Sequence, residues 1–393
     1  MMRNHRLAAL CASAVVLALT VTACGLSGGK SGATSGSPSV SSGAQGADPF
    51  AVAKGPSVGS PGPATAPEWE GKTSIPAGQP DMNKDGKVSI GVITSGDTND
   101  GTYYQSVADA AQYAGTKYGW KVSVQGLVPL TQALSAAENL CRQRVDMVII
   151  GDAQLAQAVN AAKEPICKDT FFYLQGGYGS PKQDATFTQS YDVGLSYAYV
   201  AGVATGVYMK NKNIKKAGFI AGLAAPFNTT IGAVFKKGVL SQVPDATVVE
   251  TYTGDQIDVG KAVEAFAAQQ SQGIGLVYPY FGAPTVAIAK KANAANIPVI
   301  GSPIDFCGST SASFIASVIF APGYYLAPLL DDFANGKLPL GGTRNWRLGV
   351  DPVPAVHTCS SAGSDGAAID AAIKQAQSEI NNGTIDPLKL ATG

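Results

Sequence analysis

The sequence predicts an α/β protein with two doubly wound parallel sheets. Short apolar runs alternate with helical segments between residues 87 and 209, and the same alternation begins again after residue 213. Strands that alternate with helices are typical of parallel sheets covered by helices on both faces. A chain of this length can form two lobes with separate cores. Strands and helices left over at the end indicate that the chain crosses between the lobes more than once.

The elements of the first half follow from this alternation. Largely apolar runs indicate strands at residues 88–93, Lys121–Leu127, Met147–Gly151, Phe171–Gln175 and Thr186–Tyr191. Between and after them, the sequence indicates helices at Tyr103–Lys117, Thr131–Arg144, Ala153–Lys163 and Asp192–Met209.

The second half repeats the pattern. Its strands are expected at Ala217–Ala221, Thr247–Tyr252, Leu276–Tyr280, Pro298–Gly301, Phe314–Phe320 and Trp346–Val350. Its helices are expected to begin near Thr229, Val259 and Pro284, and two more to span Gly323–Asn335 and Ala367–Ile380. We assign residues 81–195 and about 314–337 to the first lobe, and residues 196–313 and about 338–393 to the second.

The loop after the first strand is the first candidate for a ligand site. Residues 94–101 are rich in Gly, Asp, Asn and Thr and lie at the carboxyl end of that strand, where open α/β sheets place their ligands. Two short polar groups beside two amphipathic rings suit a small polar ligand with a flat or ring-shaped part. The candidates are Asn99, Asp100, Tyr103 and Tyr104. The alternative for Asp100 is a cap on the helix that begins near Thr102.

The N-terminal segment has the pattern of a targeting signal. Arg3 and Arg6 precede a short apolar core, Leu7–Thr20, which is too short for a stable membrane span. Small residues then lead to Cys24 in a pattern that resembles the lipobox of bacterial lipoproteins. The resemblance implies a signal peptide at residues 1–23 and a lipid on Cys24, which would anchor the protein to the membrane. The alternative is an ordinary secretory signal cut nearby.

Residues 24–80 are predicted to form a flexible tether. They are rich in Gly, Ser, Pro and Ala and poor in large apolar residues, so they bury too little surface to offset their ordering entropy. Trp69 and Ile75 could dock the end of the tether onto the body. The following residues, Asp81–Gly86, copy half of a calcium loop, but the twelfth position is Val92 where a Glu is needed. A polar turn is the better interpretation, and we expect no metal and no cofactor.

Charge and cysteine content limit the function further. Removal of Arg3 and Arg6 with the signal reduces the 28 basic residues to 26, against 28 acidic ones, which leaves no basic surface for nucleic acid. An even number of cysteines in an exported chain predicts two disulfides. The pairs with the shortest loops, among three connectivities, are Cys141 with Cys167 and Cys307 with Cys359. Zinc is a poor alternative because no Cys-x-x-Cys spacing is present.

Four motifs, in order, carry a resemblance to a known family. They are Asn-Asp-Gly-Thr-Tyr-Tyr-Gln at residues 99–105, Ala-Gly-Val-Ala-Thr-Gly at 201–206, Phe-Ile-Ala-Gly at 219–222 followed by Pro226, and Ile-Asn-Asn-Gly-Thr-Ile-Asp-Pro at 380–387. Over about Lys87–Pro387 the chain resembles the basic-membrane-protein family of ABC-importer substrate-binding lipoproteins, which includes purine-nucleoside receptors. The resemblance implies a bilobed type I periplasmic-binding-protein fold that binds a small molecule between its lobes.

The sequence departs from the family pattern at two positions that bear on the ligand. The family's ribose-binding aspartate is replaced by Pro303, with Asp305 two residues further on. The family's lysine on the strand that returns across the hinge is replaced by Phe320. The stacking ring of the first loop is kept as Tyr103. We therefore expect a nucleoside-like or sugar-like ligand that offers a ring and hydroxyl groups.

Further candidate ligand contacts follow the ends of other strands. They are Asp152 in the first lobe and Phe227, Phe281 and Asp305 in the second, with Gln175, Tyr178, Tyr280 and Asn228 as weaker candidates. The alternative for the aromatic residues Tyr103, Phe227 and Phe281 is packing against the sheet. The alternative for Asp305 is a turn residue near Pro and Gly.

The sequence thus predicts a monomeric solute-binding lipoprotein on the extracytoplasmic face of the membrane. It would capture a small molecule between two lobes and deliver it to an ABC permease. A sensor that presents its closed form to a membrane signalling partner is the alternative. An enzyme is not expected, because the sequence has no Gly-x-Ser-x-Gly elbow, P-loop or His-based metal motif.

Overall fold

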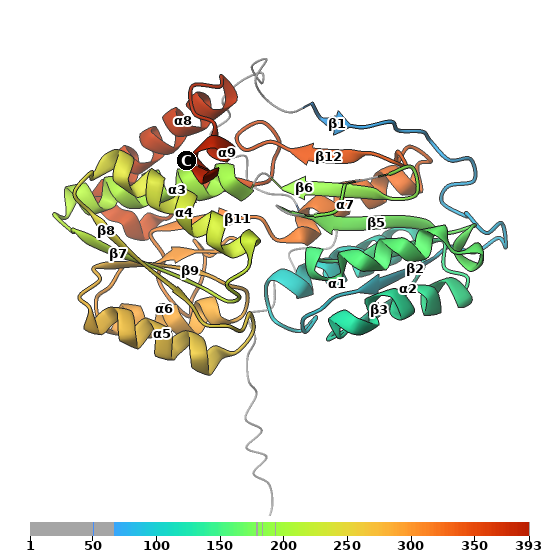
Figure 1. The fold of residues 1–393 in the computed structure, drawn as a ribbon, viewed down its shortest axis with the longest axis horizontal. Helices are drawn as coiled ribbons and strands as arrows, with labels where there is room; N and C mark the ends of the chain where they lie inside the picture. Colours follow the sequence, from blue (N-terminus) through green and yellow to red (C-terminus); the bar gives the residue numbers. More distant parts are fainter. Residues whose placement is uncertain (1–49, 51–66, 178–179, 183, 193, 393) are drawn as a thin grey trace, which may run out of the picture. The chain divides into compact units, whose positions relative to one another are not determined.

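The computed structural model describes residue 50 and residues 67–392, except residues 178–179, 183 and 193. All described residues belong to one compact unit. The predicted signal peptide, Cys24, most of the tether and Tyr178 lie outside the described residues. Figure 1 traces the elements along the chain.

The first sheet has seven strands in the order β1-β12-β6-β5-β4-β2-β3. All neighbours are parallel except β1, which runs antiparallel to β12. Its inner strands are apolar and buried on both faces, as expected for a parallel sheet between two helical layers. The bounds are β1 Trp69–Glu70, β2 Ser89–Ile93, β3 Lys121–Gln125, β4 Met147–Ile150, β5 Phe171–Gly176, β6 Thr188–Asp192 and β12 Thr343–Trp346.

The second half of the chain forms two three-stranded sheets, in the orders β8-β7-β9 and β10-β11-β13. A parallel bridge between Val277 and Val299 links them. Only β13 runs antiparallel to its neighbour among these described strands. The bounds are β7 Lys216–Ala221, β8 Thr247–Tyr252, β9 Leu276–Tyr280, β10 Ile300–Gly301, β11 Ala316–Ile319 and β13 Ala355–Thr358.

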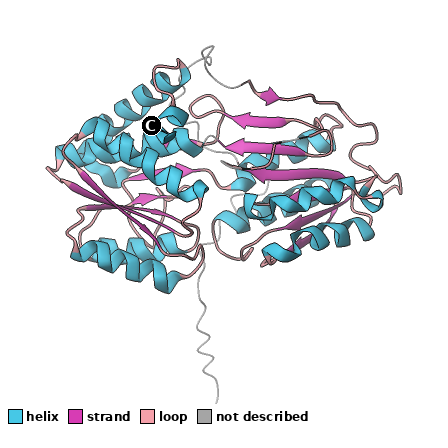
Figure 2. Ribbon diagram, viewed as in Figure 1, coloured by secondary structure: helices cyan, strands magenta, loops and turns pink. Residues whose placement is uncertain are grey.

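Helices cover the strands on both faces (Figure 2). In the first half, α1 and α7 share a core cluster with one face of the sheet, and α2 and the 3₁₀ segment η2 share another with the opposite face. In the second half, α3, α4 and α8 cover one face, and α5 and α6 the other. The bounds are α1 Tyr103–Tyr118, α2 Ala133–Arg142, η2 Ala153–Lys163, α3 Gly194–Asn211, α4 Pro226–Gln242, α5 Val259–Ser271, α6 Pro284–Ala294, α7 Pro322–Ala334, α8 Gly366–Asn381 and α9 Pro387–Thr392. Short 3₁₀ turns occur at η1 Leu130–Gln132, η3 Pro165–Cys167 and η4 Ser360–Asp365.

The two lobes do not have fully separate cores, which corrects the prediction. One buried cluster contains Ile90 and Phe171 from the first sheet together with Phe219 and Tyr278 from the second. Only the outer faces, under α2 and η2 and under α5 and α6, have clusters of their own. The physical reason is that the long α3 is buried along almost all of its length, so it joins the inner layers of both halves.

Within the part of the chain that the structure describes, three connections pass between the two halves, as the multi-crossing prediction required. The crossings join β6 to α3, β11 to α7, and β12 to β13. The lobe boundaries differ from those expected at two places. Strand β11 pairs with β10 and β13 in the second half, although α7 does pack against α1 in the first. Strand β12 pairs with β6 in the first sheet, although we placed it in the second lobe.

The described residues ahead of β2 contact the body of the protein at several places. Strand β1 pairs with β12, which confirms that Trp69 docks, and Ser74 pairs with Leu340. Ile75 is exposed and does not dock. The predicted turn at 81–86 is confirmed, because both carboxylate oxygens of Asp81 accept backbone N–H groups, from Asp85 at 3.1 Å and Gly86 at 3.0 Å.

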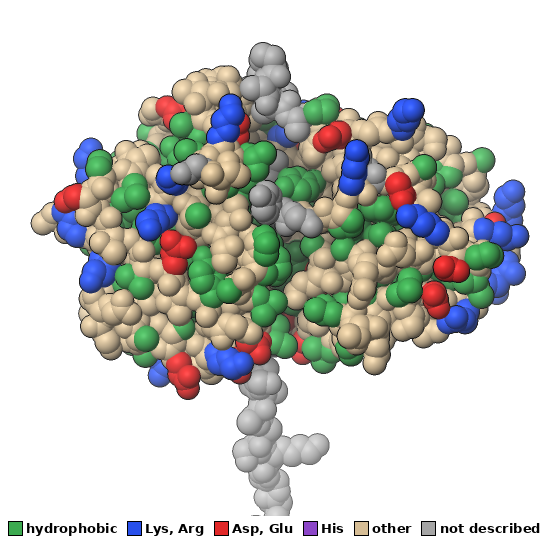
Figure 3. Space-filling model, viewed as in Figure 1, with side chains coloured by type: hydrophobic (Ala, Val, Ile, Leu, Met, Phe, Trp, Pro, Cys, Tyr) green, Lys and Arg blue, Asp and Glu red, His purple; other side chains and the backbone are tan. Residues whose placement is uncertain are grey.

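Both predicted disulfides are present. Cys141 bonds to Cys167 and Cys307 bonds to Cys359, which is the shortest-loop pairing. On the face drawn in Figure 3, basic and acidic side chains are interspersed, and no basic patch gathers there.

Candidate ligand-binding site

A cavity of about 300 Å³ lies between loops of the two halves. We call it the loop cavity. The first half contributes the segments that follow β2, β3 and β4, and the second half contributes those that follow β7 and β8. All of these are carboxyl ends of parallel strands, the edge at which α/β sheets bind ligands. Its lining residues are Ser95, Tyr104, Leu127, Val128, Pro129, Leu130, Gln154, Leu223, Gly254, Asp255, Gln256 and Ile257.

Tyr104 is the predicted site residue that lines the loop cavity. Its hydroxyl accepts a hydrogen bond from Gln154 Nε2 at 3.1 Å and lies 3.4 Å from Ser95 Oγ. The ring needs a glycine beside it, because a Cβ on Gly96 would lie 2.1 Å from the ring. Burial, with a smaller contribution from the charge of Asp152, raises the pKa of Tyr104. The phenol therefore stays neutral and keeps its hydrogen at physiological pH.

Asp152 positions the polar wall of the loop cavity. It is buried, and its carboxylate accepts hydrogen bonds from Ser95 N at 2.8 Å, Ser95 Oγ at 2.9 Å and Gln154 N at 3.0 Å. Burial raises the pKa of this carboxyl group. Because its oxygens are used within the protein, Asp152 orients Ser95 and Gln154, and it is not one of the residues that line the cavity.

Asp100 caps helix α1, as the alternative interpretation held. Its carboxylate accepts hydrogen bonds from Thr102 N and Thr102 Oγ1, both at 2.9 Å, and from Gln105 N at 3.0 Å. Asn99 is exposed, and its side chain donates to Asp97 at 3.1 Å. Both residues are thus engaged by their own loop.

Asp100 also marks a close approach between the two halves. Gly282 follows β9, and a Cβ on it would lie 2.9 Å from Thr102 Oγ1 and 3.0 Å from Asp100 Oδ2. Contacts this short would force the two segments apart. The absence of a side chain at Gly282 therefore allows the loop after β9 to rest against the start of α1.

Three rings fill the space beside the second crossing. We call Tyr197, Tyr280 and Phe320 the aromatic stack. Phe320 stacks with Tyr197 at a centroid distance of 4.7 Å and with Tyr280 at 5.2 Å. The two tyrosine hydroxyls are hydrogen-bonded at 2.9 Å. Tyr103 approaches from α1, with its ring centroid 6.4 Å from that of Phe320. The ring that replaces the family's lysine is thus used in packing between elements of both halves.

The candidate ligand contacts of the second half lie in three different environments. Phe281 is 2% exposed and packs in the core cluster with Ile220 and Ile288, which favours packing over ligand contact. Phe227 lies in the first turn of α4 and is partly exposed. Asn228 is buried and donates to Leu223 O at 2.8 Å and to Gln256 Oε1 at 3.1 Å, so it supports the wall of the loop cavity from behind.

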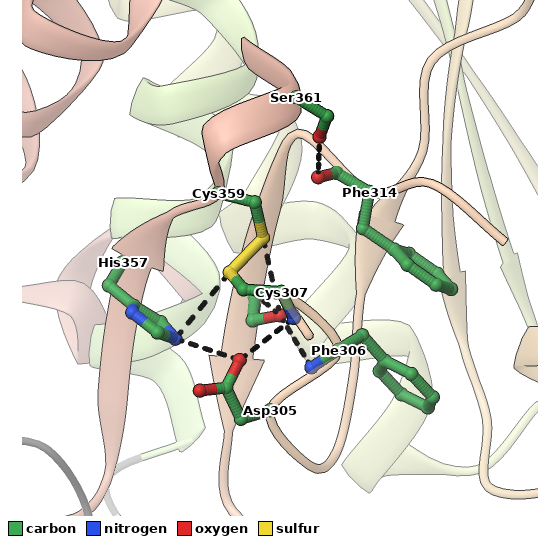
Figure 4. Close-up of a disulfide and its surroundings, with 8 residues drawn as sticks. Asp305, Phe306, Cys307, Phe314, His357, Cys359 and Ser361 are labelled. Atoms are coloured by element: carbon green, nitrogen blue, oxygen red, sulfur yellow. Dashed lines mark hydrogen bonds and ion pairs between the residues drawn. A yellow bond between two sulfur atoms is a disulfide. The ribbon is translucent and has the colours of Figure 1, made fainter. Parts of the chain in front are cut away.

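Asp305 is not among the residues that line the loop cavity. It pairs with His357 at 3.1 Å and accepts from Cys307 N at 2.9 Å, the pattern of a turn (Figure 4). Burial opposes ionisation, but the hydrogen bonds from His357 and from Cys307 N lower the pKa of Asp305. In the first half, Gln175 is buried and accepts from Tyr173 Oη at 2.8 Å within its own strand.

The sequence analysis missed Gln154 and Gln256, the two amide side chains that line the loop cavity. Gln154 stands four residues after the end of β4 and two residues after the predicted Asp152. Gln256 lies in the loop after β8, a strand end for which we named no residue. A search of every loop after a predicted strand for amide side chains would have found both.

The match to a family model now adds to this geometry. Residues 87–377 match the family described as ABC transporter substrate-binding protein PnrA-like, also called Bmp. The chain belongs to this family. Its fold and family are those of proteins that bind solutes and are not enzymes, and the substrate-binding proteins of ABC transporters work outside the cytoplasm. No curated protein sequence matches the chain.

Solved structures give the same fold. A solute-binding protein of an ABC transporter from Conexibacter woesei has a TM-score of 0.58 at 18% identity, covering 76% of this chain and 98% of its own. A transcriptional activator of the comK gene from Bacillus halodurans also has 0.58 and 18%, covering 76% and 99%. The arabinose-binding component from Shewanella has 0.52 and 16%, covering 74% and 97%. Among the described residues, no helix is long and apolar enough to cross a bilayer.

Proposed function

We propose that this Bmp-family protein captures a small, neutral, ring-containing solute in the loop cavity and delivers it to the permease of an ABC importer. The observation that carries the proposal is that one cavity is lined by strand-end loops of both halves. A solute held there contacts both lobes at once, as required of a ligand that holds two lobes closed. A lipid on Cys24 would keep the monomeric protein on the outer face of the membrane.

The lining of the loop cavity favours a neutral ligand. Its polar groups are amides and hydroxyls, and no Lys or Arg side chain is among the lining residues. The one carboxylate, Asp255, accepts hydrogen bonds from Ile257 N at 3.0 Å and Asp258 N at 3.1 Å, so it is engaged by its own turn. Leu127, Leu130 and Ile257 supply apolar area for the flat faces of a ring.

A nucleoside or a sugar fits this chemistry, because both offer hydroxyl groups and an uncharged ring. Replacement of the family's acid and cation by Pro303 and Phe320 removes two charged contacts and leaves neutral hydrogen bonds to provide specificity. Amides such as Gln154 and Gln256 would reject analogues that leave their polar atoms unpaired after burial.

A ligand screen tests the proposal. The purified protein is heated with individual nucleosides and free sugars. A true ligand adds RT ln(1 + [L]/Kd) to the free energy of unfolding, about 2.7 kcal/mol when its concentration is 100 times Kd, and so raises the melting temperature. The same ligand is recovered chemically unchanged. A binder that is modified on recovery, or protection only by charged solutes, contradicts the proposal.

Import and sensing are separated by a second experiment. The liganded protein is added to membrane vesicles that contain its permease and ATPase, and we expect ligand-dependent ATP hydrolysis and uptake. Tight ligand binding without uptake, together with a response in a membrane signalling protein, would favour the sensor.

A further inference from the structure

The surroundings of the Cys307–Cys359 disulfide hold the ligand set of a thiophilic metal. We propose that reduction of this disulfide creates a site for a divalent cation such as Zn²⁺, with the two cysteine thiolates, His357 and Asp305 as ligands. The proposal concerns the second half of the molecule and is independent of which solute the loop cavity takes.

The ligand atoms are already close together. His357 Nε2 lies 3.1 Å from Asp305 Oδ1 and 3.8 Å from Cys307 Sγ, and one ligand atom from each of the three residues lies within 4.8 Å of the others (Figure 4). Tetrahedral Zn²⁺ with bonds of about 2.0–2.3 Å places its ligands about 3.3–3.8 Å apart. The separations of His357 Nε2 from Asp305 Oδ1 and from Cys307 Sγ therefore match such a site to within a few tenths of an ångström. The limit of 4.8 Å for the whole set leaves up to about 1 Å of adjustment between Asp305 and Cys307. Once the disulfide is reduced, Cys359 Sγ moves away from Cys307 Sγ and supplies the fourth ligand.

Strand pairing also holds the elements that carry the cluster. His357 and Cys359 lie on and directly after β13, which pairs with β11, while Asp305 and Cys307 lie in the turn between β10 and β11. The hydroxyl of Ser317 on β11 lies 3.6 Å from Cys307 Sγ and 3.7 Å from Cys359 Sγ. A hydroxyl at this place can donate a hydrogen bond to a thiolate, which favours the metal-binding form of the cysteines.

The two disulfides of the protein differ in access. Cys141 and Cys167 are 3% and 1% exposed, whereas Cys307 is partly exposed beside the exposed Asp305. Thiol–disulfide exchange requires that the attacking thiolate reach a sulfur atom. A mild reductant therefore reaches Cys307–Cys359 first. Among the described residues, the Cys141–Cys167 pair belongs to no cluster of metal-binding groups.

A dithiol can reduce the Cys307–Cys359 disulfide. The dithiol gives two electrons and two protons to the Cys307–Cys359 bond, is itself oxidised to a disulfide, and leaves two thiols. A divalent cation then displaces the two thiol protons and bonds to both thiolates, to neutral His357 and to the Asp305 carboxylate. Disulfide and metal thus link the same two chain segments in the two redox states.

The turn that contains Asp305 and Cys307 supports the connection from β11 to α7. The carbonyl of Pro303 accepts hydrogen bonds from Phe320 N at 2.8 Å and Ala321 N at 3.1 Å, so the turn that contains Asp305 holds the start of the β11–α7 connection. Loss of the disulfide without a metal would loosen this connection, and metal binding would restore it.

Cobalt spectroscopy tests the site. The intact protein is reduced with a water-soluble phosphine, which binds metal more weakly than a dithiol does, the excess is removed, and the protein is titrated with Co²⁺ and then Zn²⁺. We expect a thiolate-to-cobalt charge-transfer band that Zn²⁺ removes, and no band in the oxidised protein. His357→Gln should weaken Zn²⁺ binding by more than about 100-fold, because even outer-shell substitutions cost up to that factor. Under reduction, Zn²⁺ should raise the melting temperature above that measured with a chelator.

Two controls make the result specific. Asp386→Asn removes a carboxylate whose side chain is 42% exposed, against 41% for Asp305, and should leave Zn²⁺ binding unchanged, whereas Asp305→Asn weakens it. The double variant Cys307→Ser, Cys359→Ser keeps the other cysteine pair and should lose the band. Absence of the band in the reduced wild type, or its persistence in the double variant, would overturn the proposal.

Discussion

The loop cavity and the aromatic stack both lie near the carboxyl ends of strands, but they use their residues in opposite ways. In the aromatic stack, Tyr197, Tyr280 and Phe320 satisfy one another by ring contact and by a hydroxyl–hydroxyl hydrogen bond. In the loop cavity, Tyr104, Gln154 and Gln256 line about 300 Å³ of open space. Rings that meet other rings are used for packing, with Tyr103 linking the aromatic stack to the first half, whereas the amides and the phenol of the loop cavity are left open to a ligand.

The largest effect is expected in the aromatic stack. Phe320→Ala removes a buried ring that stacks on Tyr197 and Tyr280 of the second half and approaches Tyr103 of the first. We expect a loss of about 3–5 kcal/mol in the free energy of unfolding, as for other buried Phe residues. Denaturant unfolding measures it. Phe320→Leu keeps much of the apolar volume and should lose less. Equal losses for both variants would show that ring stacking, and not burial, dominates at this position.

The second largest effect is expected where Gly282 approaches Asp100. In Gly282→Val the added side chain meets Thr102 Oγ1 and Asp100 Oδ2, and overpacking of this kind costs about 1–3 kcal/mol. Because the cost falls only on the form in which the segments touch, we expect weaker ligand binding and a larger radius of gyration at saturating ligand, measured by X-ray scattering.

Gly308 provides the matched control for that experiment. It has no atom within 4 Å of an added Cβ, so Gly308→Val should leave affinity and scattering unchanged. Identical scattering of the Gly282 and Gly308 variants with ligand bound would contradict the assignment of this contact to closure.

The loop cavity should control affinity more than stability. Gln256→Leu removes a polar group that lines the cavity, and loss of one buried hydrogen bond to ligand costs about 1–3 kcal/mol, or roughly tenfold in Kd for each 1.4 kcal/mol. Isothermal titration with the ligand found by thermal screening measures it. Gln272→Leu, on an exposed residue of the same lobe, is the control. An unchanged Kd in the Gln256 variant would exclude the cavity as the binding site.

The smallest effect is a dependence of stability on pH that originates beside the loop cavity. Burial raises the pKa of Asp152, so in the acidic range the folded state binds more protons than the unfolded state. The contribution of Asp152 therefore falls as pH rises from its unfolded pKa to the raised folded value, by at most about 1.4 kcal/mol per pH unit. Unfolding of wild type and Asp152→Asn at a series of pH values should diverge in that direction. A difference independent of pH would argue against the raised pKa.

Much of the framework could be predicted from local pattern. The run Met147–Ile150 is apolar at every position, which predicts a strand buried on both faces, and the structure confirms it. Strand β12, which we assigned to the second lobe although it pairs with β6 in the first sheet, lacks such an apolar pattern. Its residues Thr343–Trp346 include a threonine, an arginine and an asparagine, yet all four are buried. Arg344 pairs with Asp351 at 3.1 Å and Asn345 donates to Pro67 O at 2.9 Å, partners that no periodicity can show.

The site was less predictable than the framework. An acidic or aromatic residue after a strand can contact a ligand, or it can serve the fold as a hydrogen-bond acceptor or a core side chain. Asp100 and Asp152 both follow strands, and both serve as acceptors for neighbouring N–H groups. Phe281 and Tyr104 are both aromatic residues at strand ends, but one enters the core and the other lines the loop cavity. Which use applies depends on what the opposite lobe places against each side chain.

The sequence by itself determined the α/β pattern, the family and the presence of two disulfides, because each depends on composition or on local motifs, whereas it left three disulfide connectivities open. Only the tertiary structure decided which polar groups are already satisfied, which rings pack against one another, and that Asp305, His357 and the Cys307–Cys359 disulfide meet. These contacts join segments that strand pairing brings together from distant parts of the chain, and the energy of a buried polar group depends on the partner it meets there.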